Sequence, residues 1–159
     1  MKEIHEDEII NLTAENFRDL SPEEKQQDDF RRVFQNDKVK YWYDLAIEDI
    51  DVAQGLLNIG KILYAGFICH LAVEKALKAR IESIGETPLK VHNLIRLAEL
   101  GNLEMSEEQL GLLQRLNPLQ IEARYPAYKQ AIADILTKED CAELIEQAEE
   151  VISWIEKQL

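Results

Sequence analysis

The apolar residues of this chain recur at the three- and four-residue spacing of α-helices, and no segment shows the alternation of a β-strand. A first apolar stripe runs over residues 40–58 and ends at Gly60. A second helix is predicted from about residue 62 to residue 83, ending at Gly85, and it is apolar around most of its circumference. Because only a tight turn near Gly60 separates them, the two helices are expected to pair antiparallel.

Shorter helices are predicted in the second half of the chain. One spans about residues 93–100 and stops at Gly101. Another begins at a capping box formed by Ser106 and Gln109. We expect Pro118 to interrupt this helix, because proline lacks the amide hydrogen that a helix interior needs.

The region that follows carries weaker signals. A weak helical signal resumes near Ile121, and Pro126 is expected to break it again. The last helix is capped by Thr137, with Asp140 three residues on, and its apolar positions repeat to the end of the chain. Laid against the two long helices, it completes an all-α fold, an up-and-down bundle of four or five helices.

Residues 1–38 differ in composition from residues 39–159. They hold 11 acids and 6 bases with scattered apolar residues, so they form an acidic extension, and residues 39–159 form one bundle domain. Ser21 and Pro22 predict the start of a short amphipathic helix at about residues 22–36. Its apolar stripe can pack on the bundle or on another chain, and consists of Phe30, Val33 and Phe34.

The charge and the cysteines narrow the classes of function. A net charge of -13 repels a phosphate backbone, so binding of nucleic acid is disfavoured. Cys69 and Cys141 lack the spacing of a disulfide framework or a zinc site, so we expect free thiols. The acidic amino terminus resembles no export signal, and no apolar run is long enough for a membrane span, which predicts a cytoplasmic protein.

Polar side chains stand out within the apolar second helix. His70, Glu74 and Lys78 fall in one angular sector of it and need partners from other helices. Asp49 lies in the apolar stripe of the first helix, so we expect a polar or basic partner on the second helix. The candidate partners for Asp49 are Lys75, Lys78, His70 and Arg124, although the wheel points Lys75 away from His70 and toward solvent.

Four motifs in order resemble the HEPN family, small helical domains of prokaryotes and some eukaryotes. The second helix carries His70-x-Ala72-x-Glu74-Lys75-x-Leu77-Lys78-Ala79. The other three are Ala46-x-x-Asp49-Ile50-x-x-Ala53, His92-Asn93-Leu94 and Arg124-Tyr125-Pro126. The resemblance covers roughly residues 41–126 and implies the helical bundle already predicted.

The resemblance also implies a range of activities. Many HEPN proteins are metal-independent ribonucleases marked by an arginine followed four to six residues later by a histidine, and no arginine here has such a histidine. Others accompany a small nucleotidyltransferase, or form the helical half of kanamycin-type nucleotidyltransferases. This favours a non-catalytic module that binds a nucleotide or assists such an enzyme. The alternatives are a divergent ribonuclease of the toxin–antitoxin type, and a purely structural interaction protein.

The candidate nucleotide-binding residues come from these motifs. His92 is either a loop tether near a helix start or an acid–base group, which the ribonuclease alternative would pair with Arg124. Residues 124–128, Arg124-Tyr125-Pro126-Ala127-Tyr128, form what we call the proline corner. It suits recognition of phosphate and base, or equally a subunit interface. No metal, cofactor or catalytic residue is predicted. The predicted set is Asp49, His70, Glu74, Lys78, His92, Arg124, Tyr125 and Tyr128.

A homodimer is also expected. The second helix and the proline corner together need more cover than the short helices provide. A two-fold partner would place the two Arg124 residues across one groove, with His70, Glu74 and Lys78 near its floor.

Overall fold

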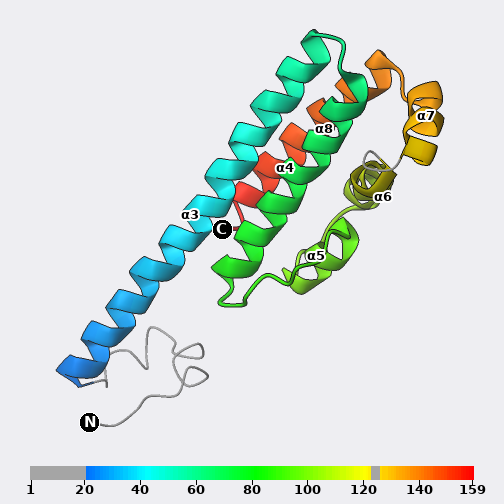
Figure 1. Ribbon diagram of the computed structural model, residues 1–159. Coiled ribbons are helices and arrows are strands. Elements are labelled where there is room, and N and C mark those ends of the chain that lie inside the picture. The colour runs from blue at the N-terminus through cyan, green and yellow to red at the C-terminus, as the bar shows by residue number, and fades with distance from the viewer. Residues whose placement is uncertain (1–20, 123–125) are drawn as a thin grey trace.

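The computed structural model describes residues 21–122 and 126–159, with all their side chains except those of residues 28–35, 121–122 and 126–129. Every regular element in the described residues is an α-helix, which confirms the predicted fold class. In Figure 1 two long helices, α3 and α4, run side by side, α8 lies against them, and α5, α6 and α7 follow the other side of α4.

Helix α3 spans Pro22–Asn58 without a break. Ser21 and Glu24 form its capping box: the Ser21 hydroxyl accepts a hydrogen bond from the Glu24 amide at 3.2 Å, and the Glu24 carboxylate accepts one from the Ser21 amide at 2.8 Å. The prediction of a separate short helix over residues 22–36 was therefore wrong about its end. No glycine or proline lies between it and the next helical stripe, so nothing stops the helix there.

Helix α4 spans Ile62–Ser83, as predicted, and is bounded by glycines in left-handed conformation, Gly60 with φ 79° and Gly85 with φ 84°. It packs against α3, α8, α6 and α5, and many of its residues are buried within this one chain. The expected homodimer rested on an uncovered α4 together with the corner at residues 124–128. The packing removes the first of these reasons, and dimerisation itself stays a prediction.

Helix α8, Lys138–Glu156, closes the bundle behind α3 and α4. Thr137 and Asp140 form its predicted capping box. Tyr43 of α3 meets this helix, where burial and a hydrogen bond to Glu156 raise the pKa of the tyrosine to about 12.

Helices α5 (Leu94–Leu100) and α6 (Glu107–Glu122) cover the opposite side of α4. The bounds of α5 match the prediction, but the expected interruption at Pro118 was wrong, since α6 continues through it. A proline inside a helix loses one backbone hydrogen bond. Leu116 and Leu119, fully and almost fully buried on either side of Pro118, anchor both halves of α6 in the core and offset that loss.

Helix α7, Pro126–Ile135, lies where the sequence predicted no helix. Pro126 begins the helix instead of preventing one. At the first helical position a proline costs no hydrogen bond, because that amide would have had no partner within the helix.

None of the helices in the described residues is long and apolar enough to cross a membrane.

Candidate functional site

Four predicted polar residues, His70, Glu74 and Lys78 of α4 and His92 of the loop before α5, come together beside Trp42 of α3. We call these five residues the His92 cluster. Three of them occupy successive turns of α4, which is why the 3.6-residue period could place them on one side. The loop supplies the fourth because the turn after Gly85 brings residues 91–93 back along α4.

His70 is completely buried and holds this loop by its backbone. Its Nε2 lies 3.1 Å from the carbonyl oxygen of His92. A carbonyl can only accept, so His70 donates through Nε2–H.

Glu74 is the centre of the cluster. Its side chain is 5% exposed, and Oε1 lies 2.5 Å from Nδ1 of His92 and 3.7 Å from Nζ of Lys78. A buried carboxylate is stable only with such partners. The carboxylate also fixes the orientation of the His92 ring, about half of whose side chain is exposed.

Lys78 joins this network to α3. Its Nζ lies 5.4 Å from the centroid of the Trp42 ring, a cation–π contact, while its side chain is only 12% exposed. The ammonium group therefore sits between an aromatic face and a carboxylate.

Asp49 makes a separate ion pair with Lys75. Nζ of Lys75 lies 2.5 Å from Oδ2 of Asp49, with side-chain exposures of 23% and 16%. The prediction of a partner for Asp49 on the second helix is confirmed, and among the four candidates the partner is Lys75, which pairs with Asp49 while part of its side chain still reaches solvent. Asp49 thus belongs to an α3–α4 contact outside the His92 cluster, because it pairs with Lys75 and not with Lys78.

His92 does not cap α5. That role belongs to Asn93, whose side-chain oxygen accepts a hydrogen bond from the Arg96 amide at 3.1 Å. Asn117 of α6 supports the same turn by accepting a hydrogen bond from the Leu94 amide at 2.8 Å. With Asn93 as the cap, the His92 ring faces Glu74.

The proline corner adds nothing to this site that can be described. Arg124 and Tyr125 lie outside the described residues, and the side chain of Tyr128 does too. The predicted association of Arg124 with His92 stays a prediction.

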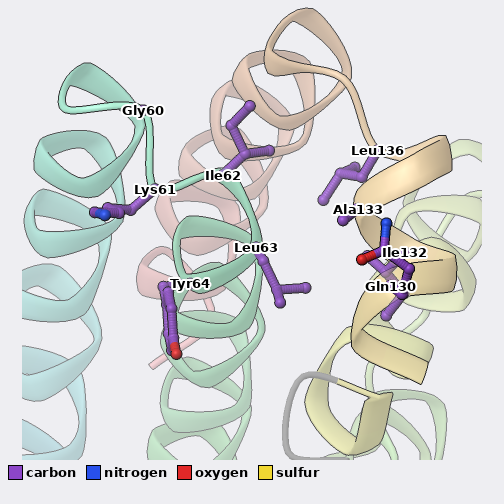
Figure 2. Close-up of a pocket in the computed structure, with 9 residues that line it drawn as sticks. All are labelled: Gly60, Lys61, Ile62, Leu63, Tyr64, Gln130, Ile132, Ala133 and Leu136. Atoms are coloured by element: carbon purple, nitrogen blue, oxygen red, sulfur yellow. The ribbon is translucent and has the colours of Figure 1, made fainter. Parts of the chain in front are cut away.

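A pocket of about 420 Å³ opens at the amino-terminal end of α4. Figure 2 shows it between the first turn of α4 and α7, with Leu63 and Leu136 pointing into the gap and Lys61 turned outward on the far side of α4. A second pocket, of about 290 Å³, shares Ile132 and Leu136 with the first. Neither pocket includes a residue of the His92 cluster.

Helix α4 approaches α6 closely at this end, through Gly66. A Cβ atom there would lie 3.1 Å from Leu119 Cδ1 and 3.4 Å from Leu136 Cδ2. The missing side chain therefore brings the two helices together next to the pocket.

Sequence patterns did not identify two residues, Trp42 and Arg80, that join α4 to other segments. Trp42 was assigned to the apolar stripe alone, since nothing in its local sequence signals a cation above its ring. Arg80 joins three segments: its Nε donates to the Gly101 carbonyl at 2.9 Å, and its Nη1 to the Gln158 carbonyl at 2.6 Å. Its place near the end of an otherwise apolar helix was the available signal.

The remaining residues with known chemistry are the possible metal ligands and the two cysteines. No group of three or more histidine, cysteine, aspartate or glutamate side chains there is placed to hold a metal ion. Cys69 and Cys141 are unpaired and buried. Burial raises the pKa of both thiols, that of Cys141 to about 11, which disfavours a reactive thiolate.

Comparison with known proteins gives a consistent assignment. The crystal structure of TT1696 from Thermus thermophilus matches with a TM-score of 0.67 and 24% identity, over 77% of this chain and 98% of that chain. The structure of ST0689, an archaeal HEPN homologue, matches with a TM-score of 0.62 and 21% identity, over 76% and 96%. These likenesses concern the fold. No curated protein matches significantly. The HEPN domain profile matches residues 39–158, so the chain belongs to the HEPN domain family.

Proposed function

We propose that this chain is a non-catalytic HEPN module that binds a nucleotide at the His92 cluster, on its own or as an accessory to a small nucleotidyltransferase. The observation that carries the proposal is the position of the Lys78 ammonium, between the Trp42 ring and the Glu74 carboxylate, next to a half-exposed imidazole. An ammonium and an imidazole are donors for phosphate oxygens, and an indole ring offers a surface on which a base can stack.

The acidity of the chain does not oppose a small ligand. The net charge of -13 repels a long polyanion over its whole length, whereas one nucleotide meets only the local field. At the His92 cluster the Glu74 carboxylate is balanced by the Lys78 ammonium 3.7 Å away.

Isothermal titration calorimetry with ATP as the probe tests the proposal. Lys78→Met should weaken binding at least about tenfold, because a charge-assisted hydrogen bond contributes about 1.5–3 kcal/mol. Lys90→Met is the matched control, an exposed lysine in the loop just before His92, and it should leave the Kd unchanged. Absence of binding by the native chain, or equal weakening by both variants, would exclude this site and favour a purely structural role.

The ribonuclease alternative has one observation in its favour. Glu74 holds Nδ1 of His92, an arrangement that also orients a general base, and the other ring nitrogen makes no hydrogen bond within the described residues. Incubation of the chain with transfer RNA in EDTA, beside His92→Ala, separates the two functions. We expect no product in either sample, and a cleavage product that depends on His92 would replace the binding proposal.

A further inference from the structure

The pocket of about 420 Å³ between the first turn of α4 and helix α7 has the size of a ligand site. Small-molecule sites in proteins measure about 300–1,000 Å³, and an apolar cavity of about 150 Å³ is enough to hold one benzene ring. The pocket contains no residue of the His92 cluster, so a molecule bound there is independent of the nucleotide proposed above. We call it the α4–α7 pocket.

Aliphatic side chains from both helices form the walls of this pocket. Figure 2 shows Leu63 of α4 and Leu136, which directly follows α7, pointing into the gap from opposite sides. By contrast, the side chains of Lys61 and Tyr64 lie on the side of α4 away from α7. The rest of the apolar lining consists of Ile62, Ile132 and Ala133.

One polar side chain of α7 lies at the edge of the gap. Nε2 of Gln130 donates a hydrogen bond of 2.8 Å to Oδ1 of Asp134, which fixes the amide group, and Oε1 of Gln130 makes no hydrogen bond within the described residues. An amide oxygen can only accept, so it suits a ligand with an O–H or N–H donor. A water molecule is held poorly between such walls, because it needs about two to four polar partners.

The pocket is already open in the unliganded chain, and α7 keeps it so. Ile132 is 3% exposed and anchors α7 in the core, so the helix cannot move closer to α4 without overpacking there. The second pocket, of about 290 Å³, also borders Ile132 and Leu136 but lies toward α6 and α8. Helix α7 therefore rests on the bundle between two unfilled spaces, and a molecule in the α4–α7 pocket adds dispersion contacts that the chain itself does not supply.

We propose that the α4–α7 pocket binds a neutral aromatic molecule of one or two rings that carries a single hydroxyl or ring N–H group. The flat ring lies between the facing surfaces of α4 and α7, against Leu63 and Leu136, and its donor binds Oε1 of Gln130. A charged ligand is disfavoured, because none of the side chains that line this pocket directs a charge into the gap to offset the loss of water.

Isothermal titration calorimetry of the full chain with 2-naphthol, at about pH 7 where its hydroxyl is neutral, measures the binding. We expect a Kd on the order of 10–100 μM for a ligand of this size. Ala133→Phe places a ring in the pocket from the α7 wall and should raise the Kd at least about tenfold. The matched control is Ala131→Phe, the same change at a second exposed alanine of α7 that does not line the pocket, and it should leave the Kd unchanged.

Gln130→Leu tests the hydrogen bond separately from the pocket. It should raise the Kd of 2-naphthol about threefold to tenfold and leave that of naphthalene, which has no donor, unchanged. Absence of 2-naphthol binding by the native chain, binding that survives Ala133→Phe, or equal weakening by Ala133→Phe and Ala131→Phe would overturn the proposal. Tighter binding of 1-octanol than of 2-naphthol would also overturn it, because the occupant would then be an alkyl chain.

Discussion

Two stretches of α4 differ in how they meet the rest of the molecule. We call the first turns, Ile62–Gly66, the apolar end, and the stretch from His70 to Lys78, which lies farther toward the carboxyl terminus of the helix, the polar end. Between His70 and Lys78 the helix carries charged groups, and all of them have partners: Glu74 binds His92 and Lys78, and Lys75 binds Asp49. Between Ile62 and Gly66 it carries no charged group, and a pocket of about 420 Å³ lies beside it. The polar end is closely joined by specific contacts, and the apolar end is incompletely filled.

The difference follows from what each kind of group requires. A buried carboxylate without a partner costs several kcal/mol, so a network such as that of Glu74 persists only when it is satisfied. Aliphatic side chains have no directional requirement, and a void beside Leu63 or Leu136 costs only lost dispersion contacts. The side chains at the polar end are therefore held in fixed positions by their partners, and those at the apolar end have room to move.

Removal of the Glu74 carboxylate, at the centre of the polar end, should have the largest effect on stability. Glu74→Ala leaves Lys78 and His92 without their anion and removes one of the two contacts that hold the loop to α4, the other being the hydrogen bond from His70 to the His92 carbonyl. We therefore expect a loss of about 2–3 kcal/mol in the free energy of unfolding. Urea denaturation followed by circular dichroism measures it. Glu146→Ala, at an exposed position of α8, is the control and should stay within about 0.5 kcal/mol of the native chain. A similar small change for Glu74→Ala would mean that the cluster contributes nothing to stability.

The same contrast explains how far the sequence could predict this molecule. The ends of α4 and α5 and the capping boxes at Ser21 and Thr137 are decided by neighbouring residues, so local patterns located them. That Asp49 needs a partner could also be predicted from neighbouring residues, because it follows from a charge in an apolar stripe. Which residue is the partner could not be predicted in this way, since the choice of Lys75 depends on how α3 and α4 are rotated against each other.

Prolines and aromatics show the same limit. Pro118 was expected to end a helix, but its effect depends on burial of Leu116 and Leu119 against other helices. The contact of Lys78 with Trp42 joins residues 36 positions apart, and no local spacing encodes it. Sequence patterns therefore indicated which groups need partners, and the packing of the helices determined which partners they have.

A smaller effect should follow from removal of the second ion pair. Asp49→Ala leaves Lys75 unpaired, but both side chains keep some contact with water, with exposures of 16% and 23%, so Lys75 can be partly solvated. We expect a loss of about 1–2 kcal/mol in the urea experiment. Asp51→Ala, an exposed aspartate on the same helix, serves as the control. An unchanged denaturation midpoint for Asp49→Ala would show that the pair does not hold α3 to α4.

The smallest effect concerns the two buried thiols, which report on the two ends separately. Sγ of Cys141 lies 3.7 Å from the Ile62 carbonyl at the apolar end, and Sγ of Cys69 lies 3.8 Å from the Leu144 carbonyl deeper in the bundle. Burial raises the pKa of Cys141 from an ordinary value of 9.0 to about 11, so only about one molecule in a thousand carries the thiolate at pH 8. Folding favours the neutral thiol, and the stability from that preference is complete below pH 9 and lost as the pH rises through about 11.

A reagent reaches these buried thiols when the structure opens, where their pKa returns to its ordinary value of 9.0. Labelling should therefore be slow at pH 8 and about fivefold faster at pH 9, with Cys141 reacting before Cys69. The single-thiol variants Cys69→Ser and Cys141→Ser assign the two rates, and labelling in urea gives the rate of the accessible thiol. The order follows from the pocket, because an opening of the incompletely filled end beside Ile62 exposes Cys141, whereas exposure of Cys69 requires α4 to leave α8. If Cys69 reacts as fast as Cys141, both ends open together and the apolar end is no looser than the polar one.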